Sequence, residues 1–430
     1  MLLDKGYSLI SSEQLDRQAI AAICRTESIL MRKLFLLLLP LLFSSSLMRA
    51  QVTSPRVFIL DAKQLLITRQ RIKESDKALT PALVKLEREA QKALSSGPFT
   101  VVSKEVTPPS GDKHDYMSQA PYFWPDPQKA NGLPYIRRDG ERNPEIEKIN
   151  NHHVKDQMED AVETLALAYY FTGDEAYATK ATQLLRVFFL EPATLMNPNL
   201  QFAQGIPGIN TGRGIGLIET RGLTRVVDAV GLLAGSKAWT NADQQGLENW
   251  FRKFLQWMLE SKNGKDESAA KNNHGTYYDV QAVSFALFLG KTALARQILQ
   301  AALSKRIVVQ IEPDGRQPLE LVRTRGWGYS VGNLDGLMLL ARLGENVQVD
   351  LWQYKTRDGR SIRKALEFLL PFAFGEQKWP YQQLGEWPPQ MLFPLIRQAA
   401  PHYSDGEFQM IVRKLPALDK ADRNNLLRRS

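Results

Sequence analysis

The sequence predicts an all-α protein in which paired helices close into an incomplete α/α toroid, a ring of stacked helical hairpins. Apolar residues recur at helical spacing along most of the chain after residue 153, and short turns separate the periodic segments. No strand–helix–strand rhythm is present, which argues against a parallel sheet. A tetratricopeptide-type solenoid is the alternative, but its repeat signature is missing. Paired helices in a toroid are the most economical all-α architecture for one large domain of this length.

The first fifty residues predict a leader rather than part of the folded domain. Residues 31–50 combine a basic start, an apolar run interrupted by Pro40 and a polar stretch that ends at Ala50, as in a secretory signal peptide. The run is too short to span a bilayer, and no cysteine follows it that could carry a lipid. Residues 1–30 fit no secretory pattern and are interpreted as a misassigned extension. We expect an exported protein, periplasmic or secreted, with no membrane anchor and a domain spanning residues 51–430.

Composition narrows the possible ligands. The only cysteine, Cys24, precedes the expected signal peptide, which excludes disulfides and thiolate metal sites from the mature chain. Lysine and arginine total 55 against 46 acidic residues, and the isoelectric point is near 9.4. The basic residues do not form dense blocks interleaved with aromatics, so a nucleic-acid partner is not expected. On charge alone, a generically basic exported protein is as good an interpretation as a protein with a polyanionic ligand. If the ligand is a polyanion, an exported protein favours an anionic polysaccharide, and the sequence leaves the oligomeric state open.

The apolar periodicity predicts helices along the chain, and one long segment interrupts them. Residues 96–150 are rich in Pro, Gly, Asp and aromatics and show no periodicity, which predicts a functional loop region. Thr172-Gly173-Asp174 ends one helix and begins the next. The expected helices span residues 57–95, 154–171, 175–190, 217–234, 240–262, 280–289, 292–304, 334–343, 361–373, 389–399 and 405–413.

Two short segments carry groups suited to chemistry. The stretch K-N-N-H-G-T-Y-Y-D, residues 271–279, places two amides, an imidazole and two phenols together, although alone it is equally typical of a turn. The stretch E-L-V-R-T-R-G-W-G-Y-S, residues 320–330, contains Arg323 and Tyr329. On one regular helix these two side chains would point to different faces, because six residues advance about 600°. Glycines between them predict a tight loop that brings both side chains to one point.

Asn, His, Arg and Tyr together suit β-elimination on a uronic acid without a metal or a thiol. The C5 proton is hardly acidic while the adjacent carboxylate keeps its charge, and hydrogen bonds to that carboxylate stabilise the enolate-like intermediate. A phenolate can then take the proton. A free tyrosine titrates at about 10, and a neighbouring arginine favours its anion. The same phenol can return a proton to the leaving O4.

The chain resembles the alginate lyase domain of bacterial polysaccharide lyases from roughly Asp112 to Leu343. The similarity is carried by D-K-H-D-Y-M-S-Q-A-P-Y-F-W-P-D-P, N-H-H at 151–153, T-G-R-G-I-G-L-I-E-T-R at 211–221, K-N-N-H-G-T-Y-Y-D and R-T-R-G-W-G-Y-S. The resemblance implies an α/α toroid, a polyuronate lyase activity, no cofactor, and a catalytic site of Asn273, His274, Arg323 and Tyr329.

One departure from the family pattern concerns the arginine. In the best-known alginate lyases the step from the arginine to the tyrosine is seven residues and the tyrosine is followed by His-Asn. Here the step is six, and Tyr329 is followed by Ser330. Arg325 is therefore a rival to Arg323.

Further side chains are candidates for binding the substrate. Aromatic rings in the entrance loop could stack on sugars, two histidines could contact substrate or only begin a helix, and two arginines could bind distant carboxylates or simply pair with Glu219. The candidates are Tyr122, Trp124, His152, His153, Arg213, Arg221, Tyr278 and Arg325.

The sequence predicts a lyase that cleaves alginate, preferring mannuronate, to leave 4,5-unsaturated uronic acid ends. Tyr329 is expected to transfer the proton, Asn273 and Arg323 to neutralise the carboxylate, and His274 to assist or to act as a base on the opposite face. Glucuronan is the alternative substrate. An α/α-toroid glycoside hydrolase, which would need a carboxyl pair from Asp112, Asp115 and Asp126, and a non-catalytic glycan-binding protein are further alternatives.

Overall fold

The computed structural model describes residues 54–427, and from Ser54 onward the chain forms one compact unit. The expected extension and signal peptide lie outside the described residues, and so does Cys24. Among the described residues, no helix has both the length and the apolar character that crossing a membrane requires. The prediction of an all-α fold built from successive helices is confirmed, with a few short strands beside them.

The N-terminal segment forms two helices, so the expected single helix 57–95 is wrong. These are α2 (Ala62–Lys73) and α3 (Thr80–Leu94). Asp61 begins α2 by accepting a hydrogen bond from the Gln64 amide. The break follows from Ser75, whose φ of 61° is left-handed and cannot continue a right-handed helix.

The middle of the chain forms paired helices that pack against one another. They are α4 (Asn151–Thr172), α5 (Glu175–Phe189), α6 (Leu223–Leu233), α7 (Asn241–Glu260), α8 (Lys262–Ser268), α9 (Asn273–Phe288) and α10 (Thr292–Ala302). Helix α4 contacts α3, α5 and α6, and α9 contacts α6, α7 and α10. The predicted stop between α4 and α5 is confirmed, because Gly173 has a φ of 78° and Asp174 caps α5.

Helix α9 lies at the centre of this packing. Every residue from Gly275 to Phe288 is buried, so the helix has no solvent-facing stripe. It begins at Asn273, earlier than the expected helix 280–289. The K-N-N-H segment therefore forms the cap and first turn of α9 rather than a separate turn.

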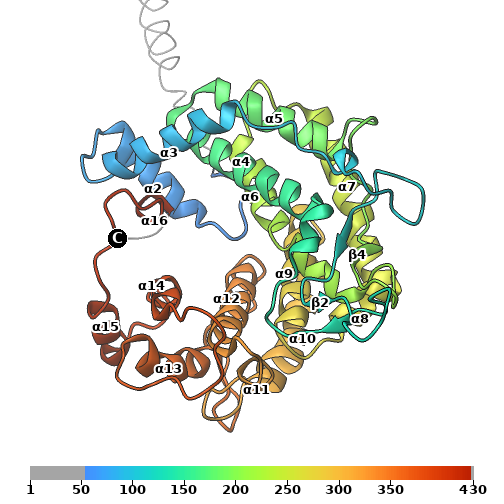
Figure 1. Ribbon diagram of the computed structural model, residues 1–430. Coiled ribbons are helices and arrows are strands. Elements are labelled where there is room, and N and C mark those ends of the chain that lie inside the picture. Colours follow the sequence, from blue (N-terminus) through green and yellow to red (C-terminus); the bar gives the residue numbers. More distant parts are fainter. Residues whose placement is uncertain (1–53, 428–430) are drawn as a thin grey trace, which may run out of the picture. The chain divides into compact units, whose positions relative to one another are not determined.

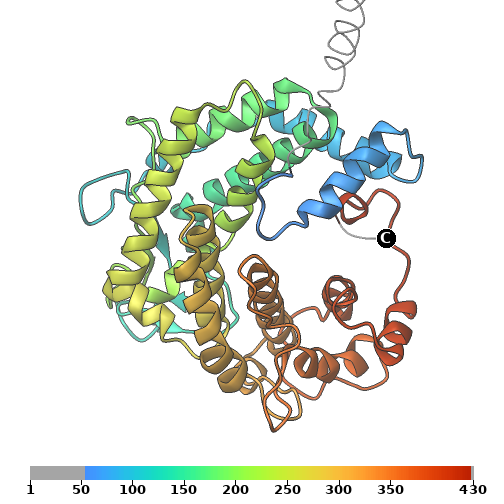
Figure 2. The same cartoon turned by 180° about the vertical axis from the view of Figure 1, so that it is seen from behind.

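The C-terminal part continues around the ring. It contains a π-helical turn η4 (Leu303–Val308), α11 (Pro318–Leu321), α12 (Gly326–Glu345), α13 (Ile362–Ala373), the 3₁₀ turn η5 (Pro389–Leu392), α14 (Phe393–Ala399), α15 (Gly406–Arg413) and α16 (Asn424–Leu427). Within this unit the helices follow one another around a ring, and α16 packs against α2 and α3 (Figure 1; Figure 2 gives the view from behind). Helix α12 begins eight residues before the expected 334–343, so Gly326 and Gly328 lie in its first turn and the expected glycine loop is wrong.

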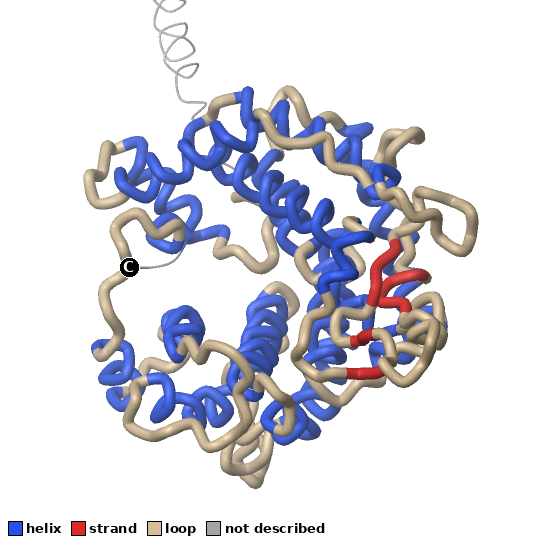
Figure 3. Tube along the Cα trace, in the orientation of Figure 1, coloured by secondary structure: helices blue, strands red, loops and turns tan. Residues whose placement is uncertain are grey.

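The non-periodic segment and residues 202–220 together form a patch of short strands and 3₁₀ turns. Strands β1 (Met117–Gln119) and β4 (Phe202–Gly205) pair in parallel, and β2 (Phe123–Trp124) pairs antiparallel with β3 (Ile136–Arg137). The 3₁₀ turns are η1 (Val101–Ser103), η2 (Pro144–Lys148) and η3 (Gly214–Thr220). Figure 3 shows the strands, in red, gathered on one side of the helices. This patch carries Tyr122, Trp124 and Asp139.

Candidate active site

Asn273 lies at the start of α9, where its backbone and side chain meet the same carboxylate. Its amide N–H donates to Glu320 Oε1 at 2.6 Å, and its Nδ2 lies 3.0 and 2.8 Å from the two Glu320 oxygens. Glu320 therefore satisfies one of the orphan donors at the helix start. Burial raises the pKa of Glu320, and the hydrogen bonds from Asn273 oppose that rise.

His274 forms a dyad with a buried carboxylate from α8. Its Nδ1 lies 2.8 Å from Glu267 Oε1. A carboxylate only accepts hydrogen bonds, so Nδ1 carries the hydrogen and Nε2 is left with its lone pair. Glu267 Oε2 has no partner among the described residues. The imidazole itself is partly exposed, so a substrate can reach it.

Tyr329 is held by Arg323, as the sequence predicts. Arg323 Nη2 donates to the Tyr329 hydroxyl at 2.8 Å, and its guanidinium carbon lies 3.9 Å from the centroid of that ring. The Tyr329 hydroxyl donates to the Tyr122 hydroxyl at 3.0 Å. Arg323 lies in the turn before α12 and Tyr329 in its first turn, so the break between α11 and α12 lets the guanidinium fold back over the ring.

Asp139 anchors the other side of the guanidinium. Its carboxylate accepts from Arg323 Nε at 3.1 Å and from Nη2 at 2.8 Å, and it also accepts from the Thr324 backbone and hydroxyl. Burial alone would raise the pKa of Asp139, but these hydrogen bonds outweigh it and hold the pKa well below the usual value. Asp139 therefore stays ionised and fixes the arginine in one orientation.

The charges around Tyr329 do not lower its pKa. Burial and the hydrogen bond with Tyr122 raise the pKa of Tyr329 above the ordinary value, and the attraction of Arg323 only partly opposes them. The expected influence of the arginine is present, but it is outweighed. The phenol is the resting form, and its conjugate base is a stronger proton acceptor than a free phenolate.

The structure brings the four predicted catalytic residues into one network. Glu320 binds Asn273 directly, and its carboxylate is attracted by both Arg323 and His274. The Arg323 backbone N–H donates to the Glu320 carbonyl at 3.2 Å. The network thus joins the start of α9 to the start of α12.

Arg325 does not share this contact with Tyr329. It is the N-cap residue of α12, its side chain is exposed, and its backbone bridges to Gln383. Arg323 is therefore the arginine that binds the tyrosine.

The predicted binding residues lie in several places. The Trp124 indole N–H donates to the Glu141 carbonyl, and the Arg138 guanidinium carbon lies 5.3 Å from the centroid of the indole ring. His152 contacts Arg142 in the first turn of α4, whereas His153 is exposed. Of the predicted aromatic residues, Tyr122 alone touches Tyr329.

The two arginines do not pair with Glu219. Arg213 donates to the backbone and side-chain oxygens of Gln204, and Arg221 lies 5.3 Å from the centroid of the Tyr277 ring. Glu219 instead accepts hydrogen bonds from Tyr116 and Ser118.

Tyr278 is buried away from the tyrosine network. Its hydroxyl donates to the Met258 carbonyl at 2.9 Å, and the side chain lines a different cavity. Its expected contact with substrate at the catalytic residues has no support in this geometry.

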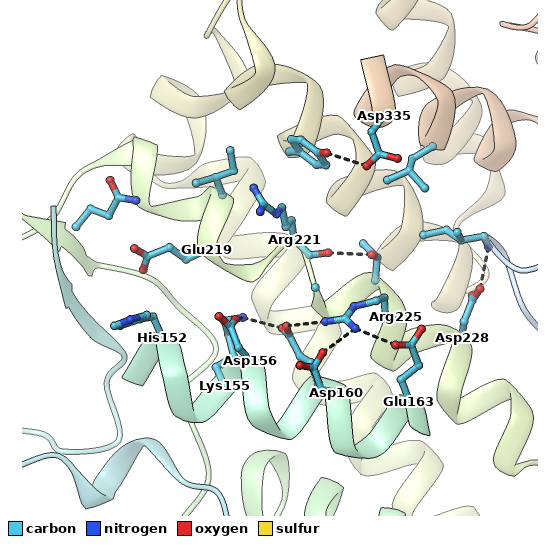
Figure 4. Close-up of a pocket in the computed structure, with 18 of the residues that line it drawn as sticks. His152, Lys155, Asp156, Asp160, Glu163, Glu219, Arg221, Arg225, Asp228 and Asp335 are labelled. Carbon is cyan, nitrogen blue, oxygen red and sulfur yellow. Dashed lines mark hydrogen bonds and ion pairs between the residues drawn. The ribbon is translucent and has the colours of Figure 1, made fainter. Parts of the chain in front are cut away.

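A cavity of about 740 Å³ is lined in large part by residues of α4, α6, α9 and α12 (Figure 4). Tyr277 on its wall follows Asn273 by four residues and so shares a face of α9 with it. None of the four predicted catalytic residues lines this cavity, although His152 and Arg221 do. Its basic lining residues are Arg142, Lys155, Arg221 and Arg225, and its acidic ones are Asp156, Glu159, Asp160, Glu163, Glu219, Asp228 and Asp335.

The acidic excess disfavours a polyanion inside the cavity. Lys155 and Arg225 are themselves engaged, since Lys155 pairs with Glu159 at 3.0 Å and Arg225 with Asp160 at 2.8 Å. The phenols and the guanidinium around Tyr329 are therefore better placed to receive an anionic sugar.

Sequence reasoning missed three carboxylates of the site: Asp139, Glu267 and Glu320. Glu320 opens the segment E-L-V-R-T-R-G-W-G-Y-S, and Glu267 precedes His274 by seven residues, but the local sequence does not indicate which residue either carboxylate contacts. Asp139 lies 184 residues from Arg323, and no local pattern links them. Within residues 54–427, no group of three or more His, Cys, Asp and Glu side chains could hold a metal ion.

Comparisons with known proteins agree with the helical fold. The alginate lyase family model matches residues 100–379. An alginate lyase from Bacteroides ovatus is 40% identical, covers 86% of this chain and 98% of its own, and gives a TM-score of 0.83. Alginate lyase A1-III from Sphingomonas species A1 is 17% identical over 88% of this chain and 97% of its own, and its TM-score of 0.55 shows a shared fold. No curated protein sequence matches.

The family match and the 40% identical alginate lyase, together with the ring of helices, show that the chain is a polysaccharide lyase. The chain belongs to the alginate lyase family. Its relatives share the α/α toroid, which confirms the fold expected from the sequence.

Proposed function

We propose that the protein cleaves alginate by β-elimination, prefers mannuronate, and leaves a 4,5-unsaturated uronic acid at each new non-reducing end. The observation that carries the proposal is the Tyr329 hydroxyl held at 2.8 Å by Arg323. The 40% identity to an alginate lyase supports alginate as the substrate.

Asn273 and Arg323 neutralise the substrate carboxylate in this proposal. Asn273 can direct one N–H between the two Glu320 oxygens, which leaves its second N–H for substrate. Arg323 uses Nε and Nη2 for Asp139 and Tyr329, and its Nη1 makes no hydrogen bond within the described part of the chain. These two donors lower the barrier because they stabilise the charge that develops when the C5 proton leaves.

Tyr329 then moves the proton. The resting phenol first loses its proton to solvent; as a phenolate it then takes the C5 proton, the C5–H electron pair forms the C4–C5 double bond, and the C4–O4 bond breaks. The resulting phenol returns the proton to O4, which regenerates the phenolate. The hydrogen bond from Arg323 stabilises that anion, while burial and the contact with Tyr122 keep it strongly basic.

His274 supplies a base for the opposite face. Guluronate is inverted at C5, so its C5 proton and O4 lie on opposite faces of the sugar. One tyrosine therefore cannot both remove the C5 proton and protonate O4. The Nε2 of His274, set by the bond from Nδ1 to Glu267, can take that proton while Tyr329 protonates O4. Mannuronate needs Tyr329 alone, which is why we propose it as the preferred substrate.

Glucuronan is the alternative substrate, because mannuronate and glucuronate share configuration at C4 and C5 and differ only at C2. Contacts to C2 from the 112–127 loop or the 197–214 loop would decide between them. The test is to incubate the mature protein with polymannuronate, polyguluronate and glucuronan in excess chelator, and to follow ultraviolet absorbance of the conjugated product.

Each outcome of this panel has a distinct meaning. Fastest absorbance growth on polymannuronate supports the proposal, and clear preference for glucuronan would overturn the substrate while leaving the mechanism. Reducing ends without absorbance would indicate hydrolysis. We also propose export on the basis of residues 31–50, which cell fractionation with an intact or deleted leader would test.

A further inference from the structure

A second cavity, of about 570 Å³, lies outside the catalytic network. It is formed by the end of α7, by α8, α9 and α10, and by the π-helical turn η4. Its volume lies within the range of sites for small ligands. π-Helical turns occur frequently at functional sites.

The floor of this cavity is formed by a buried ion pair. Arg306 and Asp279 are both buried, with Arg306 Nε 2.7 Å from Asp279 Oδ2 and Nη2 3.1 Å from Oδ1. Arg306 also donates to the Ala270 and Ser268 carbonyls at 2.7 and 2.8 Å. The floor is thus rigid, and it holds the segment that leads into the start of α9.

The rim of the cavity is cationic. Lys265, Lys271 and Lys305 line it, and all three are exposed. None of them makes an ion pair with an acidic side chain in the described part of the chain, whereas Lys262, which lies on α8 with Lys265, pairs with Asp266. Asp279 is the only acidic residue among those that line this cavity, and Arg306 already neutralises it.

The walls are apolar. Leu294 and Ile298 of α10 line the cavity, together with Leu259 and Val309, which are 36% and 46% exposed. Tyr278 also lines it, although its hydroxyl is engaged elsewhere. Apolar walls with unpaired cations at the rim match a uronate chain, whose rings present C–H faces and whose carboxylates lie at the edges.

We propose that this cavity is a second binding site for an anionic polyuronate chain, separate from the catalytic network. The proposal rests on the function proposed above. Lys271 precedes Asn273 by two residues, so the site and the catalytic network meet at the start of α9. A polymer held here stays near the catalytic residues and raises their effective substrate concentration, while a short oligosaccharide gains nothing.

The test compares two variants of the full mature chain. The double variant Lys265→Gln/Lys305→Gln removes unpaired cations of the rim, and Lys262→Gln, which removes a paired lysine of the same helix, is the matched control. Binding is measured as retardation in native gels that contain alginate, at low and high salt. Cleavage is measured on polymeric alginate and on a tetrasaccharide.

We expect the double variant to bind alginate roughly three- to tenfold more weakly at low salt. KM for the polymer should rise by a similar factor with kcat unchanged, and tetrasaccharide cleavage should match the wild type. High salt should remove the difference. Retardation of the double variant equal to that of Lys262→Gln would overturn the proposal.

Two further results separate this inference from the proposed function. If the wild type yields no unsaturated product but its retardation by alginate still depends on the rim lysines, the lyase proposal fails and the binding site stands. If a sulfated dextran is retarded as strongly through the same lysines, uronate recognition is wrong and the rim acts only as a general cationic patch.

Discussion

Arg323 and Tyr329 contact each other twice, through a hydrogen bond of 2.8 Å to the hydroxyl and through a guanidinium carbon 3.9 Å from the ring centroid. The first contact stabilises a phenolate, and the second fixes the ring. Asp139 holds the arginine from its other side, so the tyrosine is positioned before substrate arrives.

Tyr329→Phe should abolish most turnover while the protein stays folded. The change keeps the ring and removes only the oxygen that exchanges the proton, so kcat should fall by roughly 10²–10⁴-fold. Tyr122→Phe, which removes a neighbouring hydroxyl, is the matched control and should cost far less. Near-normal kcat in Tyr329→Phe, measured by product absorbance, would contradict the assignment.

Arg323→Ala and Arg325→Ala should differ sharply. Arg323 binds both Tyr329 and Asp139, whereas the Arg325 side chain is exposed at the cap of α12. We expect kcat/KM to fall by roughly 10²-fold or more for Arg323→Ala and to change little for Arg325→Ala. Equal losses would show that the second arginine also contacts substrate.

Asp139→Asn should move the pH profile to lower pH. In the proposed mechanism the phenolate is the active base, so kcat/KM should rise with pH towards the pKa of Tyr329, which is raised above its ordinary value mainly by burial. The negative charge of Asp139 also raises the pKa of Tyr329. A neutral amide at position 139 carries no such charge, so the pKa of Tyr329 should fall. The maximum kcat should also fall, because Arg323 loses its anchor. An unchanged pH profile of kcat/KM with a lower kcat would show that Asp139 has only a structural role.

Glu267→Gln should affect polyguluronate more than polymannuronate. The carboxylate fixes His274 with its hydrogen on Nδ1 and stabilises the imidazolium that forms when Nε2 takes a proton. We expect roughly tenfold slower polyguluronate cleavage and a smaller change on polymannuronate. His274→Gln is the companion variant, and equal losses on both polymers would show that His274 acts on the substrate carboxylate instead.

Gly275→Ala should damage both stability and activity. A methyl group at this position would collide with the Ala270 carbonyl and the Arg306 guanidinium, which are fixed, so the first turn of α9 must shift. We expect a loss of about 1–3 kcal/mol in the free energy of unfolding, together with slower turnover. Gly328→Ala, with nothing near the added methyl, is the control and should be neutral or stabilising in thermal unfolding.

Much of the fold follows from local patterns in the sequence. The helices over 361–373 and 405–413 agree with α13 and α15 almost residue for residue, because apolar spacing and capping residues act within a few positions. The glycine that ends α4 before α5 was predicted from the sequence for the same reason. Helix starts that depend on distant partners could not be predicted from the local sequence. Helix α9 begins at Asn273 because Glu320, far along the chain, caps it.

The sequence by itself identified the candidate groups, an amide, an imidazole, a guanidinium and a phenol in two short segments, and predicted that they act on the substrate. Only the tertiary structure decided their partners and their charge states. Asp139, Glu267 and Glu320 meet the predicted residues through packing of separate elements. The pKa of Tyr329 is raised by burial even though an arginine touches it. Side-chain identity is local information, whereas burial and ion pairing depend on which segments the folded chain brings together.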